Sequence, residues 1–193
     1  MFRIANKQVD WIGLRACVRR GLSPANTIRP SSTGIVCGAG GQARSAVYAM
    51  LSMGVRNIFV CNRTIATAHA LADHYNRLID EDIIKDARES DGTPARVRVI
   101  EKFTDQWPQE FSYPTMVVCT IPAQKQDGTA PTSFRVPDSW LRSPTGGVAV
   151  EVGIHSFLRI GRILLTILHS SLTTPWSRHS CYKCALKPNE AGF

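Results

Sequence analysis

The chain has 193 residues, 44% of them hydrophobic and 20% charged, and carries a formal net charge of +8 at pH 7. This is an ordinary globular composition, and the length suffices for one well-buried core. No stretch reaches the roughly 18 uncharged apolar residues of a membrane span, and the first residues lack the apolar run of a secretion signal, which predicts an intracellular protein of the cytoplasm or nucleus. The basic residues are scattered and accompany no helix-turn-helix, zinc-finger or RNA-binding signature, so the charge favours solubility and an anionic small ligand over nucleic acid.

Apolar residues at helical spacing predict a first helix over residues 10–20. Trp11, Leu14 and Val18 would form its one buried face, and two arginines at its end suit the helix dipole. A Pro- and Ser-rich connector over residues 22–33 then leads to the first strand.

A βαβ unit follows, with a strand over residues 34–37, a helix from Gln42 until Gly54, and a buried strand over residues 57–61. A second helix begins at Thr64. The expected buried face of the first of these helices is Ala43, Ala46, Val47 and Met50. That of the second is Ile65, Ala68, Ala72, Tyr75 and Ile79.

The polar residues 80–95 resemble an exposed insertion. Further strands are predicted over residues 96–100, 115–120 and 147–152, separated by turn-rich segments. Strands that alternate with helices imply a parallel sheet. The predicted fold class is therefore α/β, with a doubly wound, mostly parallel, Rossmann-like sheet in a three-layer α/β/α arrangement.

The cysteines fit a reducing compartment. Cys37, Cys61 and Cys119 each fall in an apolar strand-like run, where a reduced thiol behaves as a small hydrophobe, so they are predicted to be core residues. Cys181 and Cys184 have the spacing of a ligand pair, but no second Cys or His pair lies at zinc-finger distance, and no metal is expected.

Residues 34–47, GIVCGAGGQARSAV, run from an apolar strand through a glycine loop into helix-forming sequence. Such a loop lets a pyrophosphate approach backbone N–H groups at the positive end of a helix, where a Cβ would obstruct it. The spacing Gly38-x-Gly40-x-x-Ala43 is the dinucleotide fingerprint, and its place inside a βαβ unit is the context that the fingerprint requires. A tight turn without a ligand is the alternative explanation. The predicted pyrophosphate loop consists of Gly38, Ala39, Gly40, Gly41, Gln42 and Ala43.

The residues after the second strand of this unit bear on the choice between NAD and NADP. An NAD-binding protein usually places Asp or Glu there, whereas this chain has Asn62, Arg63 and Thr64. A carboxylate would repel a 2′-phosphate, and a guanidinium can hold it with paired charge-assisted hydrogen bonds, so Arg63 favours NADP. Thr64 is also a candidate cap of the next helix, and a solvated surface arginine is the alternative for Arg63.

Five motifs, VDWIG, GAGGQAR, NRT, TIPA and SPTGG, together resemble the nucleotide domain of shikimate/quinate dehydrogenases over about residues 9–152. The connector RRGLSPANTIRP resembles in particular the shikimate-dehydrogenase-like region of fungal quinate repressor proteins. The resemblance implies an NADP-binding Rossmann domain, with residues 38–43 on the pyrophosphate and residues 62–64 around the adenosine 2′-phosphate. It also implies that Thr120, Ile121 and Pro122 lie near the nicotinamide.

In the enzymes that this chain resembles, a lysine and an aspartate flank the reacting hydroxyl. Asp10 matches the aspartate, which comes from an Asn-Thr-Asp motif, but Gln8 and Val9 replace the Asn and Thr. The lysine belongs to an N-terminal substrate domain, which we expect this chain to lack. Asp10 is thus the one catalytic candidate, as acceptor of the hydroxyl proton, and the N-cap of a helix that starts at Trp11 is the alternative.

The resemblance stops abruptly after Val152, and residues 153–193 form a divergent tail that is low in acidic residues. This change predicts a reading-frame shift, a retained intron or a truncated gene model. A set of apolar residues in the tail has helical spacing and is expected to pack against the sheet rather than bind a membrane. This set is Phe157, Ile160, Leu164 and Ile167.

The expected organisation is a remnant of an interdomain helix (1–21), a connector (22–33), a Rossmann-like NADP-binding domain (34–152) and the tail (153–193). One functional hypothesis is a fragment of an enzyme that, as a whole protein, converts shikimate and NADP to 3-dehydroshikimate and NADPH. The other is a non-catalytic quinate repressor-type module that senses quinate-pathway metabolites and acts through a partner protein. A degenerate product without its own role, and a Rossmann domain for another ligand, are further alternatives. The expected small-molecule partner is a polyol, shikimate or quinate.

Overall fold

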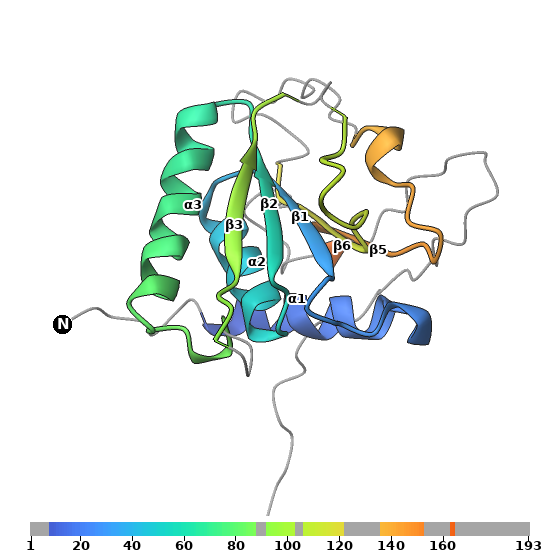
Figure 1. Cartoon of the computed structure of the whole chain (residues 1–193), viewed down its shortest axis with the longest axis horizontal. Coiled ribbons are helices and arrows are strands. Elements are labelled where there is room, and N and C mark those ends of the chain that lie inside the picture. Colours follow the sequence, from blue (N-terminus) through green and yellow to red (C-terminus); the bar gives the residue numbers. More distant parts are fainter. Residues whose placement is uncertain (1–7, 88–91, 103–105, 122–135, 153–162, 165–193) are drawn as a thin grey trace, which may run out of the picture.

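The computed structural model describes residues 8–87, 92–102, 106–121, 136–152 and 163–164. These residues form one sheet and three α-helices (Figure 1). The strands are β1 (Thr33–Cys37), β2 (Asn57–Cys61), β3 (Arg96–Ile100), β4 (Met116–Cys119), β5 (Val148–Val152) and β6 (Ile163–Leu164). The α-helices are α1 (Gln8–Gly21), α2 (Gly41–Ser52) and α3 (Ile65–Asp80), and short 3-10 helices are η1 (Pro24–Asn26), η2 (Lys85–Ala87) and η3 (Asp138–Trp140).

The sheet has the strand order β3-β2-β1-β4-β5-β6, so the chain winds outward from β1 in both directions. The first five strands are parallel to their neighbours, and β6 pairs antiparallel with β5. Every residue of β1 is buried, as expected for the central strand of a parallel sheet. The predicted α/β class with a doubly wound, mostly parallel, Rossmann-like sheet is confirmed.

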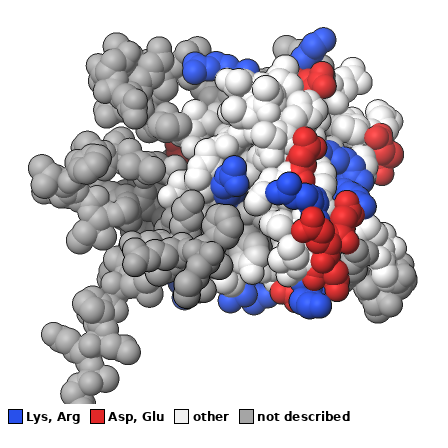
Figure 2. Space-filling model, turned by 90° about the vertical axis from the view of Figure 1, so that its left-hand side faces the viewer, with Lys and Arg blue, Asp and Glu red and all other residues white. Residues whose placement is uncertain are grey.

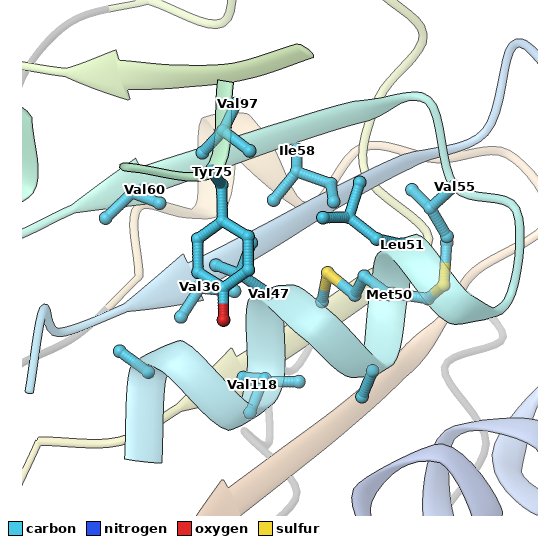
Figure 3. Packing of buried hydrophobic residues seen from close by; sticks show 14 of the residues in the cluster. Val36, Val47, Met50, Leu51, Val55, Ile58, Val60, Tyr75, Val97 and Val118 are labelled. Carbon is cyan, nitrogen blue, oxygen red and sulfur yellow. The ribbon is translucent and has the colours of Figure 1, made fainter. Parts of the chain in front are cut away.

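The three α-helices share one hydrophobic core with one face of the sheet. Figure 3 shows the part of this core that α2, Tyr75 of α3 and the strands form. Alternate strand residues such as Val36, Val60 and Val118 supply the sheet side of this core. The predicted buried faces are confirmed for α2, and for α3 with one exception. Ile65 is 39% exposed, because it is the first residue of α3 and lies at the carboxyl ends of the strands, beyond the core.

The opposite face of the sheet carries a second core built around aromatic rings. Phe59 on β2 packs edge-on against Trp107, with ring centroids 4.8 Å apart, and Trp107 in turn contacts Trp140 of η3. Within the described residues, the third layer of the predicted arrangement therefore consists of η3 and loop segments rather than an α-helix.

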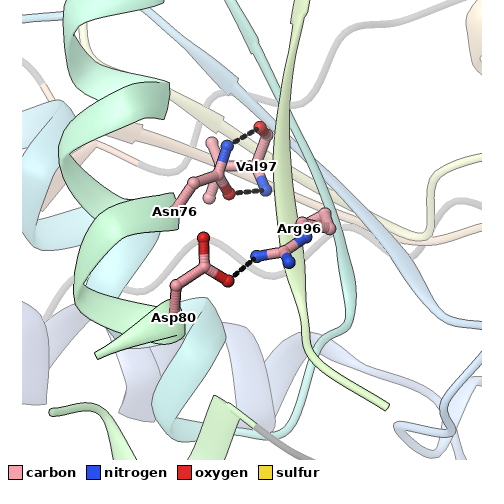
Figure 4. A network of polar contacts seen from close by, with 4 residues as sticks. All are labelled: Asn76, Asp80, Arg96 and Val97. Carbon is pink, nitrogen blue, oxygen red and sulfur yellow. Dashed lines mark hydrogen bonds and ion pairs between the residues drawn. The ribbon is translucent and has the colours of Figure 1, made fainter. Parts of the chain in front are cut away.

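Side-chain contacts fasten α3 to the edge strand β3 (Figure 4). The amide of Asn76 donates from Nδ2 to the carbonyl of Val97 at 2.9 Å, and its Oδ1 accepts from the Val97 N–H at 2.9 Å. Nearby, Arg96 forms an ion pair with Asp80, with Nη1 and Oδ1 2.7 Å apart. The Asn76 amide thus takes the place of a neighbouring strand for both polar backbone groups of Val97.

Two sequence predictions outside the sheet centre are wrong. The segment 80–95 is not wholly exposed, because Ile84, Ala87 and Ala95 are buried and Ala95 N–H donates to the carbonyl of Ala87 at 2.7 Å. In the tail, Leu164 lies in strand β6 rather than in a helix. Leu164 pairs with Glu151 of β5, and its neighbour Ile163 pairs with Val152. The other residues of the expected tail helix lie outside the described residues.

Cys37 and Cys61 are buried, as predicted, whereas Cys119 is only partly buried and packs against the second core. Cys37 and Cys61 are buried with their sulfur atoms 3.5 Å apart, as free thiols. The hydrogen bond from Cys61, together with burial, raises the pKa of Cys37 well above its usual value, and burial raises the pKa of Cys119. Both effects keep the thiols protonated. Cys181 and Cys184 lie outside the described residues.

The side of the molecule that carries α3 has a mixed charge. Lys and Arg side chains lie there among Asp and Glu side chains (Figure 2). Lys85 and Asp82, which follow α3 in the chain, form an ion pair. On this side, the described residues therefore present no patch of a single sign of charge. Among the described residues, no helix is long and apolar enough to cross a bilayer.

Candidate nucleotide-binding site

The predicted nucleotide-binding residues that the structure describes gather at the carboxyl edge of the sheet, on both sides of the strand where the winding reverses. Cys37 at the end of β1 is in register with Cys61 on β2 and with Cys119 on β4. The residues that follow these positions, Gly38, Asn62 and Thr120, therefore leave the sheet side by side. In open α/β sheets this topological switch point is where ligands bind.

Gly38 is required by the fold itself. Its φ of +109° lies in the region that favours glycine, and a Cβ built there would stand 2.4 Å from Oγ1 of Thr120. The Gly38 N–H donates to the carbonyl of Cys61 at 2.8 Å, which extends the pairing of β1 and β2 by one residue. The first glycine of the fingerprint is thus explained by the sharp turn out of β1.

Neither a positive φ nor packing among the described residues requires glycine at Gly40 or Gly41. Gly40 has an ordinary φ of −84°, and a Cβ built on either residue would meet no described atom within 4 Å. Gly40 is the N-cap of α2 and, as a glycine, offers no side chain to cap this helix end. The missing side chains therefore leave the first turn of α2 open to an incoming group. Ala43 is fully buried between α2 and the sheet, as the third position of the fingerprint requires.

The segment after β2 presents a folded turn with one unengaged cation. Asn62 donates from Nδ2 to the carbonyl of Thr64 at 2.9 Å and to the hydroxyl of Thr67 at 2.6 Å. Thr64 is the N-cap of α3, but its side chain makes no capping hydrogen bond. Arg63 is exposed, and no described residue forms an ion pair or hydrogen bond with its guanidinium.

Thr67 was missed by the sequence analysis. Its hydroxyl donates to the carbonyl of Thr64 at 2.7 Å while accepting from Asn62, so it holds the turn that carries Arg63. A threonine three residues after an N-cap threonine is the local signal that points to this kind of turn.

After β4, Thr120 and Ile121 do not have equivalent surroundings. The Thr120 hydroxyl donates to the carbonyl of Cys37 at 2.9 Å, and Ile121 packs against the second core. Pro122 lies outside the described residues.

Asp10 is the third residue of α1, which begins at Gln8, so the predicted N-cap role is wrong. Its side chain is not described, and its catalytic role stays a prediction.

These residues fit a dinucleotide. The open first turn of α2 presents backbone N–H groups and the positive end of a helix dipole, which suit a pyrophosphate. Arg63, whose guanidinium has no partner among the described residues, lies one strand away, after β2, where the ribose of the adenosine half is recognised in Rossmann folds. The preceding residue is Asn62, so this position holds no carboxylate that would repel a 2′-phosphate.

Comparisons with known proteins point the same way. Residues 26–89 match the model of the family described as shikimate / quinate 5-dehydrogenase. The chain is 46% identical over 143 residues to the quinate repressor protein of Emericella nidulans, covering 74% of this chain and 15% of that protein. It is 30% identical over 151 residues to the pentafunctional AROM polypeptide of Mycosarcoma maydis, covering 77% of this chain and 8% of that protein.

A third relative is the shikimate dehydrogenase (NADP(+)) of Thermotoga maritima, 42% identical over 71 residues, which cover 37% of this chain and 25% of that protein. The chain thus spans a quarter or less of the length of these curated relatives. With the glycine loop at the switch point of a Rossmann-like sheet, these matches establish that the chain carries a domain of the shikimate/quinate 5-dehydrogenase family.

Proposed function

We propose that this domain binds NADP(H), with Gly38 to Ala43 around the pyrophosphate. The observation that carries the proposal is the open space at Gly40 and Gly41, where neither backbone angle nor packing calls for glycine. A pyrophosphate that approaches the backbone N–H groups of α2 would explain why neither position carries a side chain. When bound, NADP(H) accepts or supplies a hydride.

Arg63 selects NADP over NAD in this proposal. Its guanidinium is exposed and, among the described residues, unpaired, so it can bind a 2′-phosphate without breaking an existing ion pair. Asn62 and Thr67 hold the turn on which Arg63 sits, which limits the conformational entropy lost on binding. One relative bears NADP(+) in its name, in agreement with this assignment.

The family membership supports a role for the domain in a longer shikimate or quinate dehydrogenase, with residues 34–152 as its nucleotide domain. The whole protein would interconvert shikimate and 3-dehydroshikimate. Asp10 would accept the proton of the reacting hydroxyl, because oxidation of a secondary alcohol needs a base within about 3 Å of that proton. By the family resemblance, Thr120, Ile121 and Pro122 would lie near the nicotinamide, which would take up the hydride.

A regulatory module is the second candidate, and one observation favours it. The chain is 46% identical over 143 residues to a quinate repressor protein, and Gln8 and Val9 stand where the resembling enzymes have Asn and Thr. In this alternative the domain keeps its nucleotide or metabolite site, and occupancy of the site changes its contact with a partner protein.

Isothermal titration of the purified chain with NADPH and NADH tests the nucleotide site. Arg63→Ala is expected to weaken NADPH binding by roughly 10- to 100-fold, as for a charge-assisted contact of about 1.5–3 kcal/mol, and to leave NADH within about twofold. Arg29→Ala is the matched control, since it removes an exposed arginine before β1, at the opposite edge of the sheet. Equal losses for both nucleotides, or binding of neither by the folded chain, would contradict the proposal.

Quinate and shikimate then separate the two roles. Added with NADP to the whole protein, either polyol should give NADPH absorbance if the role is catalytic. A sensor should bind the polyol, with no turnover, and shift its affinity for a partner.

A further inference from the structure

Thr120, the residue that follows β4, holds the start of the glycine loop, where the chain leaves β1. The carbonyl of Cys37, the last one of β1, accepts two hydrogen bonds from this single residue. One comes from the Thr120 N–H at 2.8 Å and the other from its hydroxyl at 2.9 Å. The first continues the parallel ladder, whereas the second is an additional side-chain contact at the point where the loop begins.

The same side chain also lies against the next residue of the loop. A Cβ on Gly38 would stand 2.4 Å from Oγ1 of Thr120 and 3.6 Å from its Cβ, so the threonine fills the space beside Gly38. On the other side, the Gly38 N–H donates to the carbonyl of Cys61. The turn at φ +109° is thus held from β2 and from β4 at once.

Beyond Gly38 the loop is also held by Ala39, which packs against the first core, and by Ala43, which is fully buried. Gly40 and Gly41, between these two residues, add no side-chain contacts. The contacts at Gly38 therefore fix the direction in which the loop leaves β1, while α2 holds its far end. The one hydroxyl hydrogen of Thr120 is already donated to Cys37, and is not available to donate to a ligand.

We propose that Thr120 is a positioning residue, whose hydroxyl aims the pyrophosphate loop and so sets the affinity for the part of the nucleotide common to NADPH and NADH. This inference rests on the proposed nucleotide site and goes beyond it. It differs from the implied place of Thr120 near the nicotinamide, because the effect passes through Cys37 and Gly38. A ligand without a pyrophosphate should not sense the hydroxyl.

The test compares Thr120→Val, which keeps the shape of the side chain and removes the hydroxyl, with Thr120→Ser, which keeps the hydroxyl. Each variant of the full chain is titrated with NADPH, NADH and adenosine 2′-monophosphate. Thr120→Val is expected to lose about 3- to 10-fold in affinity for both dinucleotides, as for one hydrogen bond whose acceptor keeps a second donor. Affinity for adenosine 2′-monophosphate should stay within about twofold, and Thr120→Ser should bind all three ligands as the wild type does.

Several results would overturn the inference. They are unchanged dinucleotide affinity in Thr120→Val, an equal loss for adenosine 2′-monophosphate, or a loss in Thr120→Ser as large as in the valine variant. A wild-type chain that binds none of the ligands would instead overturn the proposed nucleotide site. In that case, amide hydrogen exchange still tests whether Thr120 positions the loop. Amides of residues 38–43 should exchange faster in Thr120→Val than in the wild type, and equal rates would refute the positioning role.

Discussion

Removal of the Asn76 amide should detach the edge strand from the helical layer. In the wild type, this side chain satisfies both backbone groups of Val97, which is 3% exposed, with two hydrogen bonds of 2.9 Å. Asn76→Ala leaves the N–H and the carbonyl of Val97 without these partners. Asn76→Asp keeps the shape and the acceptor, but turns a carboxylate oxygen toward the carbonyl oxygen.

The magnitude follows from the two bonds. Each neutral hydrogen bond contributes about 0.5–1.5 kcal/mol net, so the alanine variant loses roughly 1–3 kcal/mol. Alanine is the better helix former by about 0.5 kcal/mol, which offsets part of this loss. The free energy of unfolding should therefore fall by roughly 0.5–2.5 kcal/mol, equivalent to a Tm lower by about 2–8 °C for a domain of this size. The aspartate variant should lose at least as much at pH 7, because a repulsive contact replaces an attractive one.

Urea and thermal denaturation followed by circular dichroism measure these differences. Asp80→Asn is the matched control, since it removes the neighbouring ion pair with Arg96, whose two side chains are 56% and 37% exposed. An exposed pair contributes about 0–1 kcal/mol, so this variant should lose no more than about 1 kcal/mol. The reasoning fails if Asn76→Ala leaves the free energy of unfolding unchanged, or if Asp80→Asn costs as much as Asn76→Ala.

Three further variants test the glycine loop and the buried hydroxyl of Tyr75. Gly38→Ala should cost at least about 2 kcal/mol, because of its positive φ and its contact with Thr120, whereas Gly40→Ala should stay within about 1 kcal/mol in stability and yet lose at least about tenfold in NADPH affinity. Denaturation and titration of both variants would refute this if Gly40→Ala bound NADPH normally. Burial raises the pKa of Tyr75 to about 12, and its hydroxyl donates to the carbonyl of Arg44 at 2.8 Å. The folded state therefore holds the proton more tightly, so this stabilisation is complete below pH 10 and falls by about 1.4 kcal/mol per pH unit as the pH rises toward 12. Urea denaturation at pH 9 and pH 11 should show a smaller pH dependence in Tyr75→Phe, and equal dependences would contradict the assignment.

The sheet centre and its glycine loop could be read from the sequence because their signals are local. The strand predictions over residues 57–61 and 96–100 coincide with β2 and β3. The apolar run that is β1 and the glycines after it determine both the strand end and the turn, and the order of strands and helices determines the topology. Helical faces followed likewise from spacing, since residues three or four apart share a face of an α-helix.

The rest depends on contacts between distant residues, which spacing does not encode. Trp107 and Trp140 lie in segments without periodicity, yet they cover the second face of the sheet. The Asn76 amide reaches Val97 across 21 positions, and Thr120 reaches Cys37 across 83. A polar residue on a helix or after a strand gives no local sign of which backbone group it will bind.

The loop glycines separate what the fold requires from what a ligand requires. Gly38 would be kept by any chain that makes this turn against Thr120, so by itself it says nothing about a nucleotide. Gly41 opens α2 in ordinary helical surroundings, where alanine would be favoured by up to about 1 kcal/mol, and Gly40 needs no special backbone angle. The chain thus forgoes stability at a position where its own atoms would tolerate a side chain. The proposed pyrophosphate would account for that loss, whereas a turn without a ligand would account only for Gly38.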